Sequence, residues 1–155
     1  MSEFLHRRVC QNTDMGASEP SIGYLVKHAQ ALLRARMEED LAPLGLTVSQ
    51  YSCLYRLSVE PGISAAALAR SVFMTRQSMG AMLQPLTDRG LVRRTQQADA
   101  GRALPIELTA SGAALLEDAL PIVDAVEREM IADLAPSERA ALAEGLARCI
   151  AGLSR

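Results

Sequence analysis

The stretch from Ser64 to Leu108 constrains the fold of this chain more than any other part. It contains two short helical patterns joined by a tight turn, one over 65–71 and one from Thr75 to about Gly90. Ser64 and Thr75 precede these helices, and their hydroxyls are suited to accept hydrogen bonds from the free amides of a first turn. The pattern therefore predicts two consecutive N-capped helices.

After Gly90 the pattern changes to two short extended stretches, 91–95 and 103–108. The polar segment 96–102 between them contains a glycine and predicts the flexible tip of a β-hairpin. Two short helices with a tight turn, followed by a two-stranded hairpin, describe a winged helix-turn-helix. We expect a mainly α fold with a small β-hairpin wing, in which the helix after Thr75 is the recognition element.

Longer amphipathic helices flank this unit. Apolar residues recur every three or four positions from Ile22 to Leu41, and Pro43 and Gly45 end that helix. Thr47 or Ser49 can cap a further helix that carries apolar and aromatic residues. These residues are Tyr51, Leu54, Tyr55 and Leu57.

Two more helices are expected in the carboxyl-terminal part. Thr109 caps the first, and Pro121 should kink it or loosen one turn. Its predicted stripe is Leu116, Ala119, Leu120, Val123, Val126, Met130 and Leu134. Pro136 suits the first turn of the last helix, whose stripe is Leu142, Leu146, Cys149, Ile150 and Leu153.

The chain has 155 residues, which predicts one domain. We expect a loose arm over 1–20 and a single domain over 21–155, with the winged helix-turn-helix at 46–108. The stripes over 21–45 and 109–155 lack an obvious partner inside a small winged domain. They predict dimerisation helices, and the alternative is that they pack only on their own domain.

The recognition helix has two distinct faces at about 100° per residue. Met79, Met82, Leu83 and Leu86 fall on one arc that should face the core. Gln77, Gly80, Ala81 and Gln84 lie broadly opposite, and Arg76 projects sideways from the first turn. Glutamine amides match the donor and acceptor of adenine in the major groove, and arginine suits guanine or phosphate. The alternative is an ordinary solvated helix face.

Charge supports the DNA-binding interpretation. The formal net charge is −2, yet the segment 75–102 holds five arginines against two acids, whereas 107–148 holds nine acids against three arginines. Segregated positive charge suits phosphate contact. The predicted DNA-binding residues are Ser64, Thr75, Arg76, Gln77, Ser78, Ala81, Gln84, Arg93, Arg94 and Arg102.

Several segments resemble the MarR (multiple antibiotic resistance regulator) family. They are 41–51 (LAPLGLTVSQY), Leu68-Ala69, 75–79 (TRQSM), 86–93 (LTDRGLVR) and 108–112 (LTASG). The resemblance spans about 22–152. It implies a homodimeric winged-helix transcription factor that binds a palindromic operator in double-stranded DNA. It also implies terminal helices that dimerise, and release from DNA by a small ligand or by oxidation.

The chain departs from the family pattern at two places. The wing of the family often carries Asp-x-Arg, whereas Asp99 here lies one residue further from Arg102. Pro85 falls late in the recognition helix and removes the hydrogen bond to the carbonyl of Ala81. The second departure predicts a bend in the last turn.

A small, mostly apolar effector is expected in a cleft between the dimer base and the DNA-binding part. Tyr24, His28 and Tyr51 are candidates to line it, because each has a polar tip on an otherwise apolar helix. A surface or core position is the alternative for His28. No cofactor is expected, and neither histidine has neighbours at metal-ligand spacing, so no metal site is expected.

The three cysteines leave a second function open. Cys10 lies near Arg7 and Arg8, which would favour its thiolate, whereas Cys53 and Cys149 lie on helices where a cysteine usually packs. A thiol-based redox-sensing regulator is the alternative to a ligand-released repressor, and repression versus activation stays open. A thiol-dependent enzyme is less favoured because no catalytic constellation is found, and a helical interaction module without DNA affinity is a third class.

No signal peptide or membrane span is predicted, so we expect a cytoplasmic protein.

Overall fold

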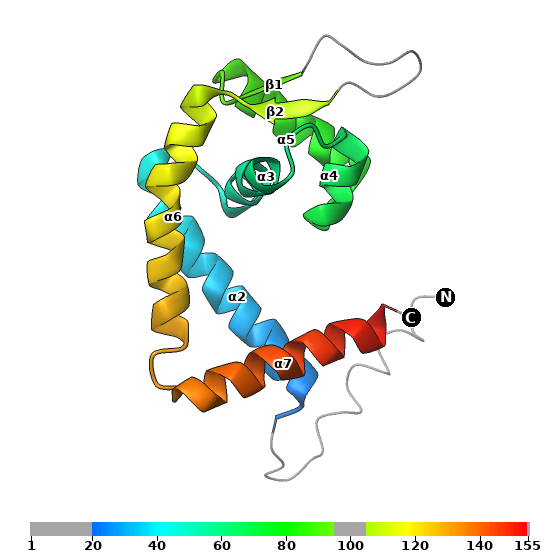
Figure 1. Cartoon of the computed structure of the whole chain (residues 1–155). Helices are drawn as coiled ribbons and strands as arrows, with labels where there is room; N and C mark the ends of the chain where they lie inside the picture. Colours follow the sequence, from blue (N-terminus) through cyan, green and yellow to red (C-terminus); the bar gives the residue numbers. More distant parts are fainter. Residues whose placement is uncertain (1–19, 95–104, 155) are drawn as a thin grey trace, which may run out of the picture. The chain divides into compact units, whose positions relative to one another are not determined.

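The computed structural model describes residues 20–94 and 105–154. The chain divides into two compact units, 1–32 and 33–155. The elements are α2 (Ile22–Leu41), η2 (Ala42–Leu44), α3 (Val48–Val59), α4 (Ala65–Ser71), α5 (Arg76–Asp88), β1 (Val92–Arg94), β2 (Ile106–Leu108), α6 (Ala110–Met130) and α7 (Pro136–Leu153). Figure 1 labels the α-helices and the strands. This order confirms the predicted fold class.

Hydroxyl caps start four of these helices. Ser64 Oγ accepts a hydrogen bond from Ala67 N, and Thr75 Oγ1 accepts one from Ser78 N, as predicted. Thr109 caps α6 in the same way. Of the two residues left open for α3, Thr47 is the cap. Its hydroxyl accepts from Gln50 N at 3.2 Å, while the Gln50 side chain accepts from Thr47 N at 3.0 Å.

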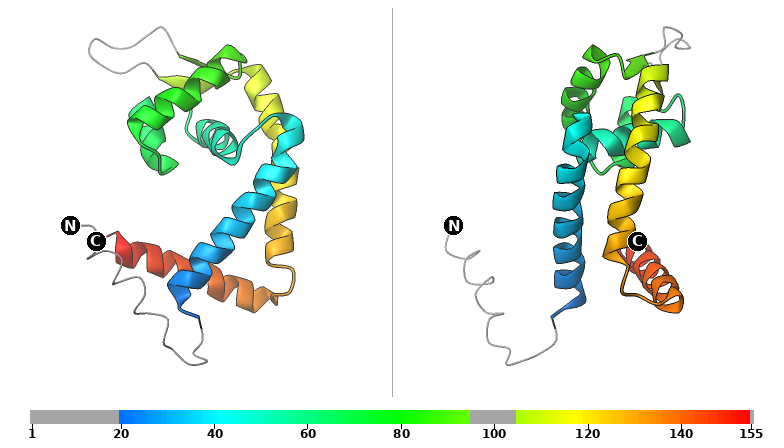
Figure 2. Two further views of the ribbon diagram at one scale, coloured as in Figure 1. Left: turned by 180° about the vertical axis from the view of Figure 1, so that it is seen from behind. Right: turned by 90° about the vertical axis from the view of Figure 1, so that its left-hand side faces the viewer.

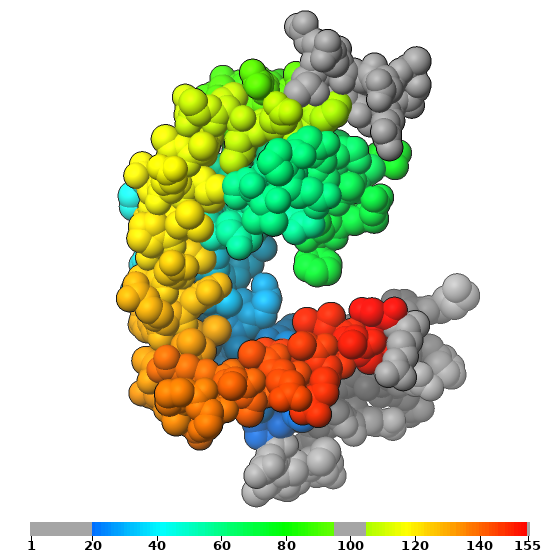
Figure 3. Space-filling model, in the orientation of Figure 1, coloured from blue at the N-terminus to red at the C-terminus, as the bar shows by residue number. Residues whose placement is uncertain are grey.

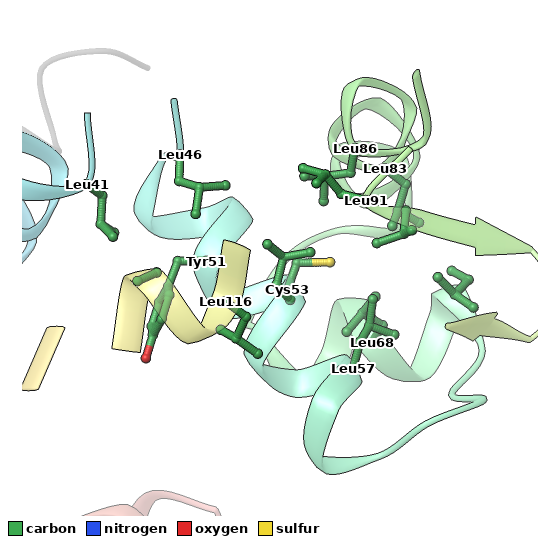
Figure 4. Packing of buried hydrophobic residues seen from close by; sticks show 14 of the residues in the cluster. Leu41, Leu46, Tyr51, Cys53, Leu57, Leu68, Leu83, Leu86, Leu91 and Leu116 are labelled. Carbon is green, nitrogen blue, oxygen red and sulfur yellow. The ribbon is translucent and has the colours of Figure 1, made fainter. Parts of the chain in front are cut away.

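One hydrophobic core joins α3, the helix-turn-helix, the wing and α6. In Figure 4 the side chains of Leu57, Leu68 and Leu83 converge around α3, and the sulfur of Cys53 points in among them. Helix α5 packs on α4 and leads directly into β1 (Figure 2). Met79, Leu83 and Leu86 are buried and Met82 is partly buried, so the predicted core face of the recognition helix is confirmed.

The wing is a two-stranded antiparallel sheet that pairs Val92 with Leu108 and Arg93 with Glu107. Among the described residues of the two predicted extended stretches, Leu91 lies outside β1 and Pro105 lies outside β2. The segment after α3 supports β2 from its other side. Gly62 N donates to Ile106 O at 3.2 Å, and Ile106 N donates to Ile63 O at 3.1 Å. These bonds tie the base of the wing to the end of α3.

Helix α6 differs from the prediction in two ways. Its stripe is buried in the core of its own chain through Leu116, Ala119, Val123 and Val126, so it does not lack a partner. The surfaces of α6 (yellow) and α3 (green) meet closely in Figure 3. The helix runs through exposed Pro121 and ends at Met130, so the expected stripe to Leu134 was too long.

Helix α7 has no buried residue. The predicted stripe of Leu142, Leu146, Ile150 and Leu153 is exposed, as are the apolar residues Ile22, Leu25, Val26 and Leu32 of α2. Met37 and Leu41, further along α2, are buried in the core. The exposed apolar stripes of the described chain therefore lie on α7 and on the first part of α2. No helix in the described ranges is long and apolar enough to cross a membrane.

Candidate nucleic-acid interface

The outer face of α5 is the centre of the candidate site. Arg76, Gln77, Gly80, Ala81 and Gln84 are all exposed, opposite the buried face of the helix. Nothing lies within 4 Å of the position that a Cβ on Gly80 would occupy. The middle of this face therefore carries only small side chains, so a DNA groove can approach the helix backbone closely.

The first turn of α5 carries free donors. Thr75 Oγ1 caps the helix by accepting a hydrogen bond from Ser78 N at 3.0 Å, and it donates one to Ser78 Oγ at 2.8 Å. Arg76 and Gln77 make no side-chain hydrogen bond or ion pair with another described residue. Both side chains are available to a ligand in the unbound chain.

Gln84 differs from Gln77 although both lie on the outer face. Gln84 Nε2 donates to Asp88 Oδ1 at 2.8 Å, one helical turn away. The same carboxylate adds negative charge to the outer end of α5. Helical periodicity alone does not distinguish the two glutamines, whereas the Asp88 carboxylate four residues after Gln84 does.

Arg89 is one of the five arginines in the positively charged segment 75–102, but its side chain is bound within the chain. Its guanidinium donates from Nη1 to the carbonyl of Gly45 at 2.7 Å and from Nη2 to that of Leu44 at 3.4 Å. Gly45 ends η2 with φ of 63°, a conformation that favours glycine. Arg89 therefore fastens the end of α5 to the turn before α3.

We expect Arg89→Ala to lower the free energy of unfolding by about 1 kcal/mol, because two charge-assisted hydrogen bonds near the surface are lost. Urea unfolding at fixed protein concentration measures this. Arg94→Ala is the matched control, since exposed Arg94 has no partner among the described residues, and its effect should stay within about 0.5 kcal/mol. Equal stability of the two variants would contradict the role given to Arg89.

The two wing arginines also differ from each other. Arg93 Nη2 lies 3.3 Å from Glu107 Oε2 on the paired strand, while Arg94 is exposed and unpaired within the described part of the chain. Within the described part of the chain, Glu107 therefore pairs with Arg93. Arg102 itself, with Asp99, lies outside the described residues.

The three effector candidates occupy different surroundings. In the first unit, the rings of Tyr24 and His28 lie 5.7 Å apart and both residues are exposed. In the second, buried Tyr51 stacks on Tyr55 at 6.1 Å, and its hydroxyl points away from the labelled leucines in Figure 4. Burial raises the pKa of Tyr51, and the charge of Glu127 raises it further, so its hydroxyl stays a neutral donor.

The cysteines within the described ranges give little support to redox sensing. Cys53 is fully buried, and burial raises the pKa of its thiol to about 12. A thiol held in its protonated form is a poor nucleophile. Cys149 is exposed on α7, and Cys10 lies outside the described residues. Across residues 20–94 and 105–154, no three His, Cys, Asp or Glu side chains are grouped to hold a metal ion.

The helix-turn-helix with its hairpin wing defines the chain as a winged helix-turn-helix protein. Residues 44–103 match the sequence profile of the MarR family. The chain is 41% identical over 124 residues to the HTH-type transcriptional repressor Rv2887 of Mycobacterium tuberculosis, covering 79% of this chain and 89% of that protein. The chain belongs to the MarR family.

Two solved structures of that repressor are also similar to the chain. Its complex with DNA has a TM-score of 0.71 at 35% identity and covers 84% of this chain and 98% of that one. Its complex with salicylic acid has a TM-score of 0.70 at 36% identity and covers 86% of this chain and 99% of that one. The likeness therefore extends over more than four fifths of this chain.

Proposed function

We propose that this protein is a homodimeric, sequence-specific DNA-binding transcriptional repressor that a small-molecule effector releases from its operator. The observation that carries the proposal is the exposed outer face of α5, where Arg76 and Gln77 have no partner among the described residues and lie beside small residues. The related repressor crystallised with DNA supports the same conclusion. In this proposal 46–108 binds DNA, and 21–45 and 109–155 supply the dimer.

The proposal assigns a role to each predicted DNA-binding residue. Arg76, Gln77, Ala81 and Gln84 face the major groove, and exposed Arg94 contacts phosphate. Ser64, Thr75 and Ser78 lie at helix starts, where their hydroxyls and the adjoining amides are suited to phosphate. Arg93 contributes positive charge while paired with Glu107. Arg102 is proposed at the wing tip, in the minor groove or on phosphate.

A gel shift with the DNA upstream of the gene, repeated across a salt series, tests DNA binding. We expect a specific complex whose affinity falls steeply with salt, because phosphate contacts release counterions. Equal affinity for this DNA and for a random duplex would contradict the proposal. So would the absence of any complex at low salt.

The dimer is proposed from the apolar stripe of α7, which is exposed in the single chain. Exposed apolar faces of this kind usually mark an interface. A two-fold dimer would set two α5 helices about one turn of DNA apart, or ~34 Å, as a palindromic operator requires.

Leu146→Glu is expected to leave each chain folded and to dissociate the dimer to the 16.7 kDa monomer at micromolar concentration. The reason is that a carboxylate would be buried in an apolar interface, whereas Leu146 is exposed in the single chain. Sedimentation equilibrium measures the mass. The control is Val59→Glu, which alters an exposed apolar residue at the end of α3, away from the stripe. A monomeric wild type, or a variant as dimeric as wild type, would contradict the interface.

The effector is proposed as a small molecule with apolar character, because the related repressor was crystallised with salicylic acid. Tyr24, His28 and Tyr51 remain the proposed lining residues. Salicylate should raise the melting temperature of the protein, since a ligand that binds only the folded state stabilises it. It should also weaken the operator complex. A melting temperature and an operator affinity both unchanged by salicylate would contradict this class of effector.

A further inference from the structure

Phe73 stands out in the turn between α4 and α5. Its side chain is 98% exposed, the most complete exposure of any large apolar residue in the described ranges. Its backbone φ is +56°, and no other described residue except glycine has a positive φ. An exposed aromatic ring and a left-handed backbone thus coincide at one position of the helix-turn-helix.

Neither the exposed aromatic ring nor the left-handed backbone of Phe73 stabilises the unbound chain. A Cβ makes the left-handed conformation unfavourable, and glycine or asparagine adopts it more readily. The turn is nevertheless fixed by backbone hydrogen bonds, from Phe73 N to Arg70 O at 3.3 Å and from Met74 N to Ala69 O at 2.8 Å. These two bonds form the C-terminal cap of α4, in which the residue after the C-cap adopts a left-handed conformation. The ring is therefore presented outward by a fixed turn.

The neighbours of Phe73 indicate what the ring contacts. Arg70 and Arg76, three residues before and after it, are exposed, and neither side chain has a partner among the described residues. Thr75, the N-cap of α5, is two residues away, within about 7 Å along the chain. An apolar ring between unpaired arginines suits a polyanion that also offers apolar surface. Duplex DNA has both, in its phosphates and in its sugar rings and thymine methyl groups.

We propose that Phe73 contacts DNA directly, packing its ring on the sugars or thymine methyl groups at the edge of the groove that α5 enters. This inference rests on the proposed DNA-binding function. It adds an apolar contact from the turn to the polar contacts expected from the recognition helix. The hydrogen-bonded turn at the end of α4 then places the ring beside the DNA strand.

The test compares Phe73→Asn, Phe73→Gly and Phe73→Tyr on the duplex that the wild-type protein selects from a random-sequence library. Asn and Gly keep the turn but remove the ring, so binding should weaken about tenfold. Both variants should melt at or above the wild-type temperature, because the strained backbone is relieved. Tyr keeps the ring and should bind nearly as wild type does. Since no charge is lost, the salt dependence of binding should not change.

Arg94→Ala is the contrasting variant, because Arg94 is the proposed phosphate contact and its loss should lower the salt slope by about one per subunit. Replacing thymine by deoxyuridine in the duplex distinguishes the two apolar surfaces. If the replacement lowers the affinity of the wild type but not that of Phe73→Asn, the ring contacts the thymine methyl group. If the wild type binds both duplexes with equal affinity, the ring contacts the sugars. Wild-type affinity in Phe73→Asn would overturn the inference while leaving the proposed function intact. Dissociation of the dimer by Phe73→Asn would overturn it in favour of a second copy of the chain. Failure of the wild type to select any duplex would overturn the proposed function as well.

Discussion

Replacing Gly112 with alanine is expected to lower the free energy of unfolding by about 3 kcal/mol. Gly112 is buried in the first turn of α6. A Cβ at this position would overlap the carbonyl oxygen of Leu91 and lie 3.3 Å from Cδ2 of Leu108. The first of these neighbours is backbone, which cannot rotate away as the end of a flexible side chain can.

The surrounding hydrogen bonds explain why the backbone has little room to move. Thr109 N donates to the same Leu91 carbonyl at 3.1 Å, and Thr109 Oγ1 donates to the Gly90 carbonyl at 2.6 Å. Gly112 N in turn donates to Thr109 Oγ1 at 3.0 Å. Any shift that accommodates the new methyl group breaks one of these bonds, which join the end of α5, the start of the wing and the start of α6.

Gly80→Ala is the matched control for this experiment. Gly80 also lies in a helix, but nothing is within 4 Å of the position that the alanine methyl group would take. Alanine there should raise the free energy of unfolding by about 0.5–1 kcal/mol, because glycine is unfavourable inside a helix. Urea unfolding of both variants at one protein concentration measures the difference. A Gly112→Ala protein as stable as wild type would show that the junction is not close-packed.

Gln77→Ala is expected to weaken operator binding by about 1–3 kcal/mol per half-site and to relax base preference at one position. Gln77 is exposed on the outer face of α5, and its amide has no partner among the described residues. Its donor and acceptor are therefore free to pair with a base edge in the major groove. Affinity for a random duplex should change little, because no charge is removed.

Gln84→Ala is the matched control, with the same residue type on the same face. Gln84 already donates to Asp88 at 2.8 Å, so binding a base requires that hydrogen bond to be given up. We expect a smaller loss of operator affinity from this variant. Titrations of operator and random duplex with both variants measure the difference. If Gln77→Ala weakens both duplexes equally, Gln77 does not read a base.

Local patterns in the sequence determined the order and type of the elements. The caps at Ser64, Thr75 and Thr109 were predicted because capping acts over three residues. The buried and exposed faces of α5 were predicted because helical periodicity places Met79 and Gln77 on opposite sides. These relations are short-range, so a single sequence contains them.

The tertiary structure alone decided which of the predicted side chains are free to bind. The bond from Arg89 to Gly45 spans 44 residues, and the Arg93 pair with Glu107 depends on strand register. The burial of the α6 stripe likewise depends on α3 packing against it. Periodicity along one helix carries no information about such distant partners, because they are set by how the elements pack. For the same reason, the need for glycine at 112 became evident only from the Leu91 carbonyl beside it.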